Sequence, residues 1–582
     1  MEQNINHQRS NYRLLGLVGN GQFGRVYCGV HRKTGQLVAI KYLHRHSLPT
    51  HAFLRELRCL LSLAHPNIVA CHAVEHCAQG RQLVLEYCAG GTLRSHMLTP
   101  LSLFDIYHLI SDVLSGLAHA HQQGIVHCDV KPENILLGYH NGRWQAKVSD
   151  FGIAKLIQDS PHRKGLGQTG SPAYMAPERF YCQYSPSADV YAVGIMLFEL
   201  LVGQRPFSGT PTALQSAHLN QPVPNAQQLV APLKSIITKA LEKLPARRYP
   251  SATDMLSDFQ KINPVSLEIP RPPTPLSYSP YQGESFHHCP QPVAHLTVGS
   301  AKTPEAISAP PIAIAYGEHI AWLQQQILSA CKTLDSPIQG LYSSPPGLMV
   351  STQHSLWYGP EPEKLAPIIH WPLPCLVDVA HHQRWAATLT TDTKQLTILT
   401  LNANSVSGSI KRPLSPDLTL KQVLTIDSGH LVIVGHTEKT GTQLQLWNRR
   451  GMYLTSLALG LHLHQLTRIG QSHQWMAIDS QAPKTVIFLT FKPLRISRIT
   501  LDISPTIMMA LPWGYLFCDA AGQMILLDRD FSPIGGIQGP AGITAIATSS
   551  PYEIIVAAWD LDSATGTIHH LNLQEFDLDI IF

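Results

Sequence analysis

His127-Cys128-Asp129-Val130-Lys131-Pro132-Glu133-Asn134 places a lysine, a glutamate and an asparagine within five positions of one aspartate. Two more motifs follow this stretch along the chain, Asp150-Phe151-Gly152 and Ala176-Pro177-Glu178. Two others precede it, the glycine-rich run Gly19–Val26 and the apolar strand-like run Val38-Ala39-Ile40-Lys41. Any one of these pieces can occur by chance. All five in this order within 160 residues indicate one shared chemistry.

The run Gly19-Asn20-Gly21-Gln22-Phe23-Gly24-Arg25-Val26 has the Gly-x-Gly-x-x-Gly spacing. Dinucleotide-binding turns share this spacing, but they join a strand to a helix and are followed by an acidic residue about 20 positions later. Here the glycines lie between two strand-like runs, Leu14–Val18 and Val26–Val30, which favours a hairpin. Because glycine has no Cβ, its backbone can approach phosphate oxygens closely.

Lys41 lies on a predicted strand, Leu37–Tyr42, among apolar residues. A lysine in such surroundings needs an anionic partner, and the phosphate oxygens of a nucleotide would supply one. Glu56, in the helical segment Ala52–Leu63, is the candidate side chain to pair with Lys41 and hold it in place. Taken alone, both residues would more often be surface charges.

In order and spacing, the five motifs resemble the signature set of eukaryotic-type protein kinases. The resemblance covers residues 12–262 and implies an α+β bilobal protein kinase fold, with a small sheet lobe followed by a larger helical lobe. Lys131, two residues after Asp129, matches the Ser/Thr-directed version of the loop. The run GSPAYMAPE at residues 170–178 is similar to bacterial members of the family.

The resemblance implies a role for each matching position. Asp129 would orient the acceptor hydroxyl and accept its proton, and Lys131 would contact the γ-phosphate of ATP. Lys41, held by Glu56, would bind the α- and β-phosphates. Asn134 and Asp150 would ligate Mg²⁺, with Mn²⁺ as the alternative. The implied ATP-binding positions are Gly19, Asn20, Gly21, Gln22, Phe23, Gly24, Val26, Ala39, Lys41, Leu85, Glu86 and Cys88.

Three further positions match structural residues of the family. Glu178 and Arg248 match the buried ion pair that ties the activation segment to the helical lobe. Asp189 begins an almost wholly apolar segment, Asp189–Val202, which we expect to be a helix buried on every side. The family uses an aspartate at this position to bind the backbone of the catalytic loop.

Cys128 departs from the family, because most members have arginine before the catalytic aspartate. That arginine receives a phosphate from the activation segment, so a phosphate on Thr169 or Ser171 would lack its principal charge partner. We therefore expect a kinase that does not need this phosphorylation. The alternative is a partly buried small residue with no regulatory meaning. Ser171 also matches a hydroxyl residue of the family that contacts the catalytic loop.

The predicted function is transfer of the ATP γ-phosphate to Ser/Thr hydroxyls of protein substrates. The rival reading is a nucleotide-binding pseudokinase scaffold. Pseudokinases usually lose the strand lysine, the catalytic aspartate or the metal aspartate, and all three are present as Lys41, Asp129 and Asp150. A small-molecule kinase is disfavoured, because the segment ending at Ala176-Pro177-Glu178 builds a peptide-binding ledge in the family.

The rest of the chain divides into two regions. We expect residues 263–340 to be a Pro/Ser-rich linker with a short helix at Ile320–Leu334. Residues 341–582 contain strand-like runs whose starts lie between 37 and 45 residues apart, which is typical of a WD40-like β-propeller of six or seven blades. A pair of β-sandwiches is the alternative. We expect this all-β domain to bind a ligand or protein partner, and Phe576–Phe582 to close its ring.

Composition excludes several other classes of protein. The net charge of +4 over 582 residues is too small to indicate a nucleic-acid partner. The 11 cysteines are odd in number and form no Cys-x-x-Cys pair, so we expect reduced thiols and neither a disulfide framework nor a zinc module. His287-His288-Cys289 resembles a metal patch only superficially. With no signal-like or membrane-spanning apolar run, we expect a cytoplasmic protein.

Overall fold

The computed structural model describes residues 11–576 except for short gaps. The gaps are residues 22–23, 44–60, 78–79, 98–100, 141–142, 152–154, 157–170, 225–228, 230, 264–277, 282, 284, 286, 299–311, 325–326, 345–346, 381–382, 403–404, 438–440, 470–473 and 492. The chain forms two compact units, and the division between them falls at Arg271 and Pro272. The two units are described separately below.

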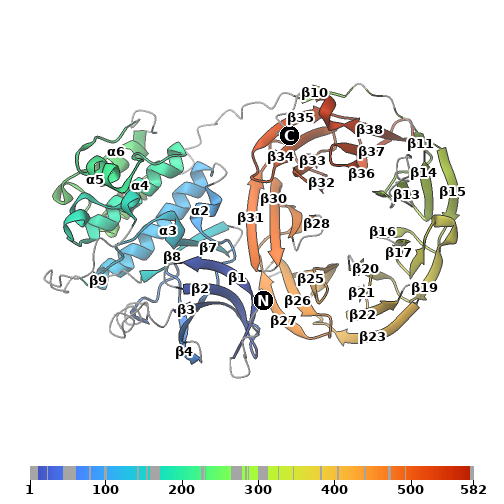
Figure 1. The fold of residues 1–582 in the computed structure, drawn as a ribbon, viewed down its shortest axis with the longest axis horizontal. Helices are drawn as coiled ribbons and strands as arrows, with labels where there is room; N and C mark the ends of the chain where they lie inside the picture. The colour runs from blue at the N-terminus through green and yellow to red at the C-terminus, as the bar shows by residue number, and fades with distance from the viewer. Residues whose placement is uncertain are drawn as a thin grey trace. The chain divides into compact units, whose positions relative to one another are not determined.

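The N-terminal unit begins with a five-stranded antiparallel sheet in the order β1-β2-β3-β5-β4 (Figure 1). Its strands are β1 (Tyr12–Gly21), β2 (Gly24–His31), β3 (Leu37–Leu43), β4 (Cys71–Cys77) and β5 (Gly80–Glu86). One face of the sheet buries a small apolar cluster made by Tyr12, Val38, Ile40 and Val84. Alternate residues of β3 therefore point into this cluster, which leaves Ala39 and Lys41 on the opposite face.

Helices dominate the rest of this unit. They are α2 (Leu93–His96), α3 (Leu103–Gln122), α4 (Pro186–Val202), α5 (Pro211–Asn220), α6 (Ala231–Ala240) and α7 (Ala252–Phe259). Ser102 caps α3 by accepting the backbone N–H of Asp105, and the apolar stripe of α3, which includes Ile106, Leu109, Val113 and Leu117, is buried. Nearly every residue of α4 is buried, as its composition predicts. A Cβ at Gly194 would lie 2.9 Å from Leu241, so α4 packs too closely there for a larger residue.

Short elements between α3 and α4 carry the three motifs around Asp129, Asp150 and Glu178. They are β6 (Ile125–Val126), the 3₁₀ turn η1 (Pro132–Asn134), β7 (Ile135–His140), β8 (Arg143–Val148), β9 (Lys155–Leu156), η3 (Pro172–Tyr174) and η4 (Pro177–Tyr181). A further turn, η6 (Pro245–Arg247), precedes α7. Strands β7 and β8 form a hairpin, and β6 pairs with β9. The loop before η1 therefore lies between two strands with pairing partners, β6 and β7, and the residues after β8 lie between β8 and β9.

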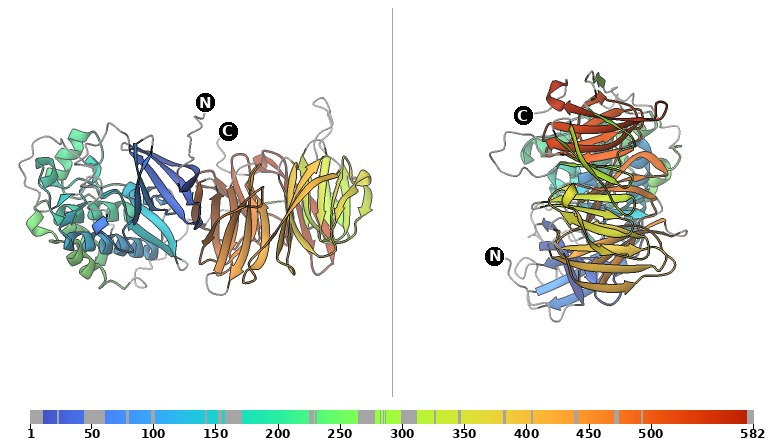
Figure 2. Two further views of the ribbon diagram at one scale, coloured as in Figure 1. Left: turned by 90° about the horizontal axis from the view of Figure 1, so that it is seen from below. Right: turned by 90° about the vertical axis from the view of Figure 1, so that its right-hand side faces the viewer.

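The C-terminal unit is all-β. Among the residues that the structure describes, it contains seven sheets, which follow one another around a ring as in a β-propeller (Figure 1). In the five sheets from β12 to β31 the strands are antiparallel neighbours in chain order, and the first strand, such as β16 or β20, lies toward the centre of the ring (Figure 1). Figure 2 shows the sheets of this unit from the side. This arrangement agrees with the expected propeller and not with a pair of sandwiches.

The first four sheets are β12 (His295–Val298), β13 (Ile312–Tyr316), β14 (His319–Gln324) and β15 (Ile327–Thr333); β16 (Ile338–Ser344), β17 (Gly347–Thr352), β18 (Ser355–Gly359) and β19 (Ala366–His370); β20 (Cys375–Val379), β21 (Trp385–Thr390), β22 (Gln395–Asn402) and β23 (Ser405–Pro413); and β24 (Thr419–Thr425), β25 (His430–Thr437), β26 (Gly441–Asn448) and β27 (Tyr453–Ala458). The turn η8 (Pro362–Lys364) lies between β18 and β19.

The last three sheets are β28 (Leu463–Arg468), β29 (Gln474–Asp479), β30 (Ala482–Phe491) and β31 (Leu494–Thr500); β32 (Ile507–Ala510), β33 (Gly514–Cys518), β34 (Gln523–Asp528) and β35 (Pro533–Gln538); and β36 (Ile543–Ser550), β37 (Glu553–Asp560) and β38 (Thr565–Asn572), followed by η9 (Leu573–Glu575). Two strands from earlier in the chain complete them. β10 (Tyr278–Pro280) pairs in parallel with β35, and β11 (His287–Cys289) pairs antiparallel with β38.

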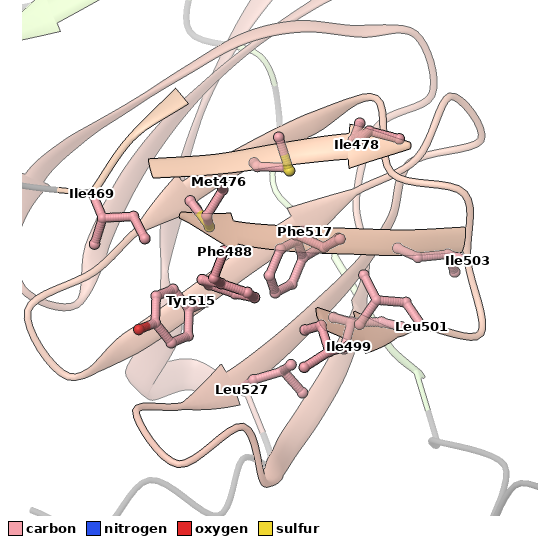
Figure 3. Close-up of a cluster of buried hydrophobic side chains, with 13 residues drawn as sticks. Ile469, Met476, Ile478, Phe488, Ile499, Leu501, Ile503, Tyr515, Phe517 and Leu527 are labelled. Carbon is pink, nitrogen blue, oxygen red and sulfur yellow. The ribbon is translucent and has the colours of Figure 1, made fainter. Parts of the chain in front are cut away.

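The apolar cores of this unit lie between adjacent sheets. Figure 3 shows one of them, in which Met476 and Phe488 from one sheet pack against Tyr515 and Phe517 from the next. A sheet in this position is covered on both faces. Ile314 and Tyr316 of β13 belong to one buried cluster, and Ala313 and Ala315 of the same strand belong to another. Removing these faces from water is the main source of stability for such a ring.

Two expectations for this region are wrong. Residues 320–334 form no helix, because they lie in β14 and β15. Ile320, Ala321 and Leu323 of β14 are all buried, so this strand lacks the period-two alternation that identifies a half-exposed strand. The proposed linker 263–340 is also wrong over much of its length, because it supplies β10, β11 and the whole sheet β12–β15.

Among the residues that the structure describes, β11 closes the ring. β11 occupies the outer edge of β38, where Cys289 pairs with Gly566. Residues 577–582 of the expected closing segment lie outside the described part of the chain. Phe576 is partly buried and packs against the cluster between the last two sheets.

Candidate active site

Lys41 lies on strand β3 of the sheet in the N-terminal unit and contributes a positive charge to the site. Lys41 lies opposite Val26 of β2 and Leu83 of β5 in the strand register, and it is 7% exposed. Its Nζ donates a hydrogen bond to Oδ1 of Asp150, which follows β8. Residues 109 positions apart therefore meet in one ion pair. The motifs that carry Lys41 and Asp150 belong to one site.

Asp150 has a left-handed backbone, with φ of 58°. This conformation is uncommon outside glycine, and it turns the carboxyl group out of the line of β8 toward Lys41. Desolvation by surrounding protein atoms raises the pKa of the Asp150 carboxyl, but the charge and the hydrogen bond of Lys41 outweigh it, so the net shift of the pKa is downward. Asp150 is therefore an anion at neutral pH and suits a cation.

The catalytic-loop motif brings two functional side chains, those of Lys131 and Asn134, to the carboxylate of Asp129. Oδ2 of Asp129 lies 2.8 Å from Nζ of Lys131 and accepts a hydrogen bond of 3.0 Å from the amide of Asn134. Oδ1 of Asp129 accepts the backbone N–H of Ser171 at 3.0 Å. The amide of Asn134 also donates to the carbonyl of Asp129 at 2.8 Å. Its side-chain oxygen is thereby oriented away from Asp129.

Asp189, the first acidic residue of α4, binds the backbone of the loop that carries Asp129. Its two carboxylate oxygens accept the backbone N–H groups of His127 at 2.8 Å and Cys128 at 2.9 Å. His121 of α3 donates from Nε2 to the same carboxylate at 3.0 Å. Burial raises the pKa of Asp189, but the hydrogen bond and charge of His121 and the loop N–H groups bring the net shift below the usual value. A buried anion thus fixes the catalytic loop to α4.

His127 links the loop to the strand that carries Asp150. It is fully buried, its Nε2 donates to the carbonyl of Ser149 at 2.8 Å, and its Nδ1 accepts the backbone N–H of Asp129 at 3.2 Å. The ring also packs against Phe151 with centroids 4.7 Å apart. The imidazole of His127 thus connects the backbone of Asp129 to that of Ser149, the residue before Asp150. This connection fixes the position of Asp129 relative to Asp150.

Cys128 occupies the position where the family usually has arginine. Its backbone is left-handed, with φ of 71°, and its side chain is buried. The thiol donates to the carbonyl of Val126 at 3.5 Å, and the Cys128 carbonyl accepts a hydrogen bond from Arg179 at 3.1 Å. The thiol adds no positive charge beside Asp129.

The expected adenine-binding positions lie on β3 and at the end of β5. Ala39 is paired with Leu85, and Val38 with Glu86. Sequence reasoning missed Lys147 of β8, which holds the side chain of Glu86 at 3.0 Å and donates to the carbonyl of Pro66 at 2.7 Å. Cys88 is buried, which raises the pKa of its thiol to about 12. It therefore stays protonated at neutral pH.

The glycine-rich run forms the expected hairpin. Gly19 pairs with Val26, Asn20 with Arg25 and Gly21 with Gly24. A Cβ placed on Gly19 would meet nothing within 4 Å, so the backbone there borders open space. Gln22 and Phe23, at the tip, lie outside the described residues.

Two other expected site residues also lie outside the described part of the chain, Glu56 and Thr169. The pairing of Lys41 with Glu56 stays a prediction. Glu178 and Arg248 are described, and they form a bidentate pair with two hydrogen bonds of 2.8 Å. A second ion network, made by Arg94, Glu133, Tyr174 and Glu199, has no motif in the sequence because its members come from four separate segments.

The donor set suits a hydrated divalent cation. No group of three or more His, Cys, Asp or Glu side chains among the described residues could hold a metal by itself. Mg²⁺ is usually bound through only one or two carboxylates together with phosphate oxygens and water. The Asp150 carboxylate with the side-chain oxygen of Asn134 meets that requirement and would hold such an ion beside a nucleotide.

Comparison with known proteins agrees with this geometry. Residues 12–259 match the family model described as protein kinase domain. The N-terminal unit is a protein kinase domain. It is 36% identical over 252 residues to the serine/threonine-protein kinase Pkn1 of Myxococcus xanthus, an alignment that covers 41% of this chain and 36% of that protein. It is also 34% identical over 261 residues to the serine/threonine-protein kinase PrkC of Bacillus subtilis (strain 168), covering 43% of this chain and 40% of PrkC.

A third relative is the probable serine/threonine-protein kinase PknB of Lactococcus lactis subsp. lactis (strain IL1403), 32% identical over 260 residues, 42% of this chain and 41% of that protein. The chain thus aligns with less than half of the length of each of these three relatives. Within the described residues, no helix has the length and apolar character needed to cross a membrane.

Proposed function

We propose that this protein is a serine/threonine protein kinase that transfers the γ-phosphate of ATP to Ser or Thr hydroxyls of protein substrates. One observation carries the proposal: Lys41, Asp150 and the Asp129 loop, which come from three distant segments, are joined by direct and His127-mediated contacts. Phosphoryl transfer requires mainly positioning and electrostatic stabilisation. These contacts would place the cation of Lys41, the metal-binding carboxylate of Asp150 and the acceptor-binding carboxylate of Asp129 at fixed positions. Such an arrangement would provide the positioning and the electrostatic stabilisation.

Each residue of this group has a distinct role in the proposed reaction. Lys41, now paired with Asp150, would bind the α- and β-phosphates and so fix the nucleotide below the Gly19–Gly24 hairpin. Asp150 and Asn134 would hold Mg²⁺, which neutralises charge on the transferring phosphoryl group. Asp129 would orient the acceptor hydroxyl and accept its proton. Lys131, 2.8 Å from Asp129, would move to meet the γ-phosphate.

The hydrogen bonds of Asp129 support its role as the acceptor-binding residue. Oδ2 is shared by Lys131 and Asn134, and Oδ1 faces the backbone N–H of Ser171. An acceptor hydroxyl needs only one carboxylate oxygen within hydrogen-bond distance. The Ser171 segment would then lie beside the acceptor, where a peptide chain must pass.

For the C-terminal unit we propose a role in binding a protein partner or sensing a ligand for the kinase. Its support is architectural: rings of β-sheets present loops and a central opening that serve as binding surfaces in many proteins. A nucleotide-binding scaffold without catalysis is the alternative for the whole protein. A cytoplasmic location stays a prediction.

Autophosphorylation and phosphorylation of a mixed Ser/Thr peptide library with Mg²⁺-ATP test the proposal on the full chain. We expect Asp129→Asn to lower the rate by about 10²–10⁴-fold, because the orienting carboxylate is lost. Asp258→Asn, a change on the exposed side of α7, is the matched control and should leave the rate unchanged. ATP binding without phosphoryl transfer in the wild type would favour the scaffold.

A further inference from the structure

An ion network beside the acceptor region is built around one arginine. Nε of Arg94 in α2 lies 2.8 Å from Oε1 of Glu133, and its Nη1 lies 2.9 Å from Oε1 of Glu199. Its Nη2 also donates to the hydroxyl of Tyr174, and that hydroxyl donates to Oε2 of Glu199. One guanidinium thus joins α2, η1, η3 and α4.

The two carboxylates differ in their environment. The side chain of Glu199 is 8% exposed, whereas that of Glu133 is 45% exposed and that of Arg94 is 35% exposed. The network therefore has a buried inner end at Glu199 and an open outer end at Glu133. A carboxylate as buried as Glu199 needs a cationic partner, since a buried charge without one is strongly destabilising.

The network adjoins the residues that would receive the acceptor peptide. Tyr174 lies three residues after Ser171, whose backbone N–H binds Asp129 at 3.0 Å. Glu133 is next to Asn134, whose amide binds the same carboxylate at 3.0 Å. The residues that bind Asp129, Ser171 and Asn134, are therefore close in the chain to two members of the network, Tyr174 and Glu133. A peptide whose hydroxyl reaches Asp129 has its neighbouring residues within reach, because an extended chain advances about 3.3 Å per residue.

We propose that Arg94 determines substrate specificity by filling an acidic site at the acceptor region with the kinase's own guanidinium. This inference rests on the proposed function. With Arg94 in place, Glu133 and Glu199 are neutralised, and a basic side chain of the acceptor peptide gains little from them. Without Arg94, the same two carboxylates form an empty site for one Arg or Lys of the peptide.

The chemistry of the guanidinium supports an exchange between protein and peptide. Arginine presents several N–H donors in a planar fork that binds carboxylates bidentately, and here the fork spans two carboxylates and a hydroxyl. A peptide arginine could reproduce these bonds from the open end at Glu133. A neutral peptide residue could not form these bonds. Removal of Arg94 should therefore favour peptides that contain an arginine over neutral peptides.

The experiment compares Ser peptides that differ only by a single Arg placed at each position from −5 to +5 around the acceptor, against an all-neutral parent. For the wild type we expect kcat/KM for the Arg peptides to stay within about 3-fold of the parent at every position. For Arg94→Ala we expect at least one position at which Arg raises kcat/KM by about 10-fold or more relative to the parent. The preference should weaken at high salt, because part of the site is exposed.

Two variants serve as controls. Arg94→Lys keeps a cation in the site and should behave like the wild type. Arg143→Ala removes another arginine that pairs with a carboxylate, Asp112 at 3.5 Å, away from this network and should leave the peptide ratios unchanged. If Arg94→Ala does not fold, Arg94→Gln, which can still hydrogen-bond Glu199 and Tyr174, is measured in its place with the same expectation.

The outcomes separate this inference from the proposed function. A wild type that phosphorylates neither itself nor any peptide would overturn the proposed function. An active Arg94→Ala or Arg94→Gln enzyme whose peptide ratios equal those of the wild type at every position would overturn the inference alone. A strong Arg preference in the wild type itself would also overturn it, because the site would then be open with Arg94 present.

Discussion

Arg248 holds Glu178 through two hydrogen bonds of 2.8 Å, and the two side chains are 0% and 6% exposed. The same guanidinium donates to the carbonyls of Glu242 at 2.6 Å, Lys243 at 2.9 Å and Ser187 at 3.3 Å. Arg248 therefore ties the turn η4, which follows the acceptor region, to the start of α4 and to the loop before α7. Its position and charge make it a structural centre of the helical lobe.

We expect Arg248→Ala to destabilise the kinase domain by about 3–5 kcal/mol, because it leaves Glu178 as a buried charge without its partner. Urea unfolding of the full chain, followed by a signal specific to the kinase domain, measures the change. Lys261→Ala removes a side chain that is 71% exposed and pairs with Asp258, and it should cost well under about 1 kcal/mol. Equal losses for the two variants would show that burial does not matter for the Arg248 pair.

His218 of α5 should make the kinase domain sensitive to mild acid. It is fully buried, its Nδ1 bonds the hydroxyl of Tyr191 at 2.9 Å, and its ring packs on Phe207. Burial, together with the nearby charge of Lys243, lowers the pKa of His218 to about 4 from 6.5. Above pH 6.5 the imidazole is neutral in both the folded and the unfolded states and contributes no pH dependence.

As the pH falls from 6.5 to 4, the unfolded chain takes up a proton at this imidazole and the folded chain does not. The unfolded state is thereby favoured, and the free energy of unfolding should decrease by roughly 3 kcal/mol across this window, using 1.36 kcal/mol per pKa unit. His218→Asn should remove this part of the slope. If the free energy of unfolding of the wild type and of His218→Asn decreases equally between pH 6.5 and 4, then His218 is not the group responsible for the pH dependence.

We expect Thr169→Ala to retain kinase activity within about 3-fold of the wild type. A phosphate on the activation segment orders it by pairing with a cation, and the residue before the catalytic aspartate is the neutral thiol of Cys128. Peptide phosphorylation by Thr169→Ala measures this, with Asp129→Asn as the control for loss of activity. Near-total loss of activity in Thr169→Ala would show that a different group receives the phosphate.

The kinase half of the fold could be predicted from sequence because its function requires fixed residues at fixed spacing. The motifs around Gly19, Lys41, Asp129 and Asp150 identify the family, and the family model covers the same region. The stripe of α3 and the apolar run of α4 follow directly from helical periodicity. Lys147 and Arg94 could not be predicted, because their partners are distant in the chain and no short motif contains both members of either pair.

The propeller was predictable only in part. The second strands of six sheets, from Gly347 to Glu553, supplied the period of about 40 residues. The seventh, β13 at Ile312–Tyr316, follows a Pro- and Ser-rich stretch whose composition is typical of a linker. His287-His288-Cys289 gave no strand signal, since a three-residue strand is shorter than any pattern. Its role depends on β38, which lies almost 280 positions later in the chain.

The closure by β11 predicts where the C-terminal unit can be cut. A fragment of residues 341–582 lacks β11 and the sheet β12–β15, so it leaves the outer edge of β38 unpaired and exposes the faces of two neighbouring sheets. Ile555 and Ile568 on one side and Leu348 and Val350 on the other would lose their partners. Each buried aliphatic side chain contributes about 1.5–3 kcal/mol, so this fragment should not fold cooperatively.

A fragment of residues 272–582 keeps all seven sheets and should show one cooperative thermal transition by circular dichroism. Deleting residues 576–582 from it removes Phe576 from a buried cluster, so the melting temperature should fall by only a few degrees. Size-exclusion chromatography of the 341–582 fragment distinguishes aggregation from folding. If that fragment is monomeric and melts at the same temperature as 272–582, the first sheet and β11 are dispensable, and the ring does not depend on its N-terminal strand for closure.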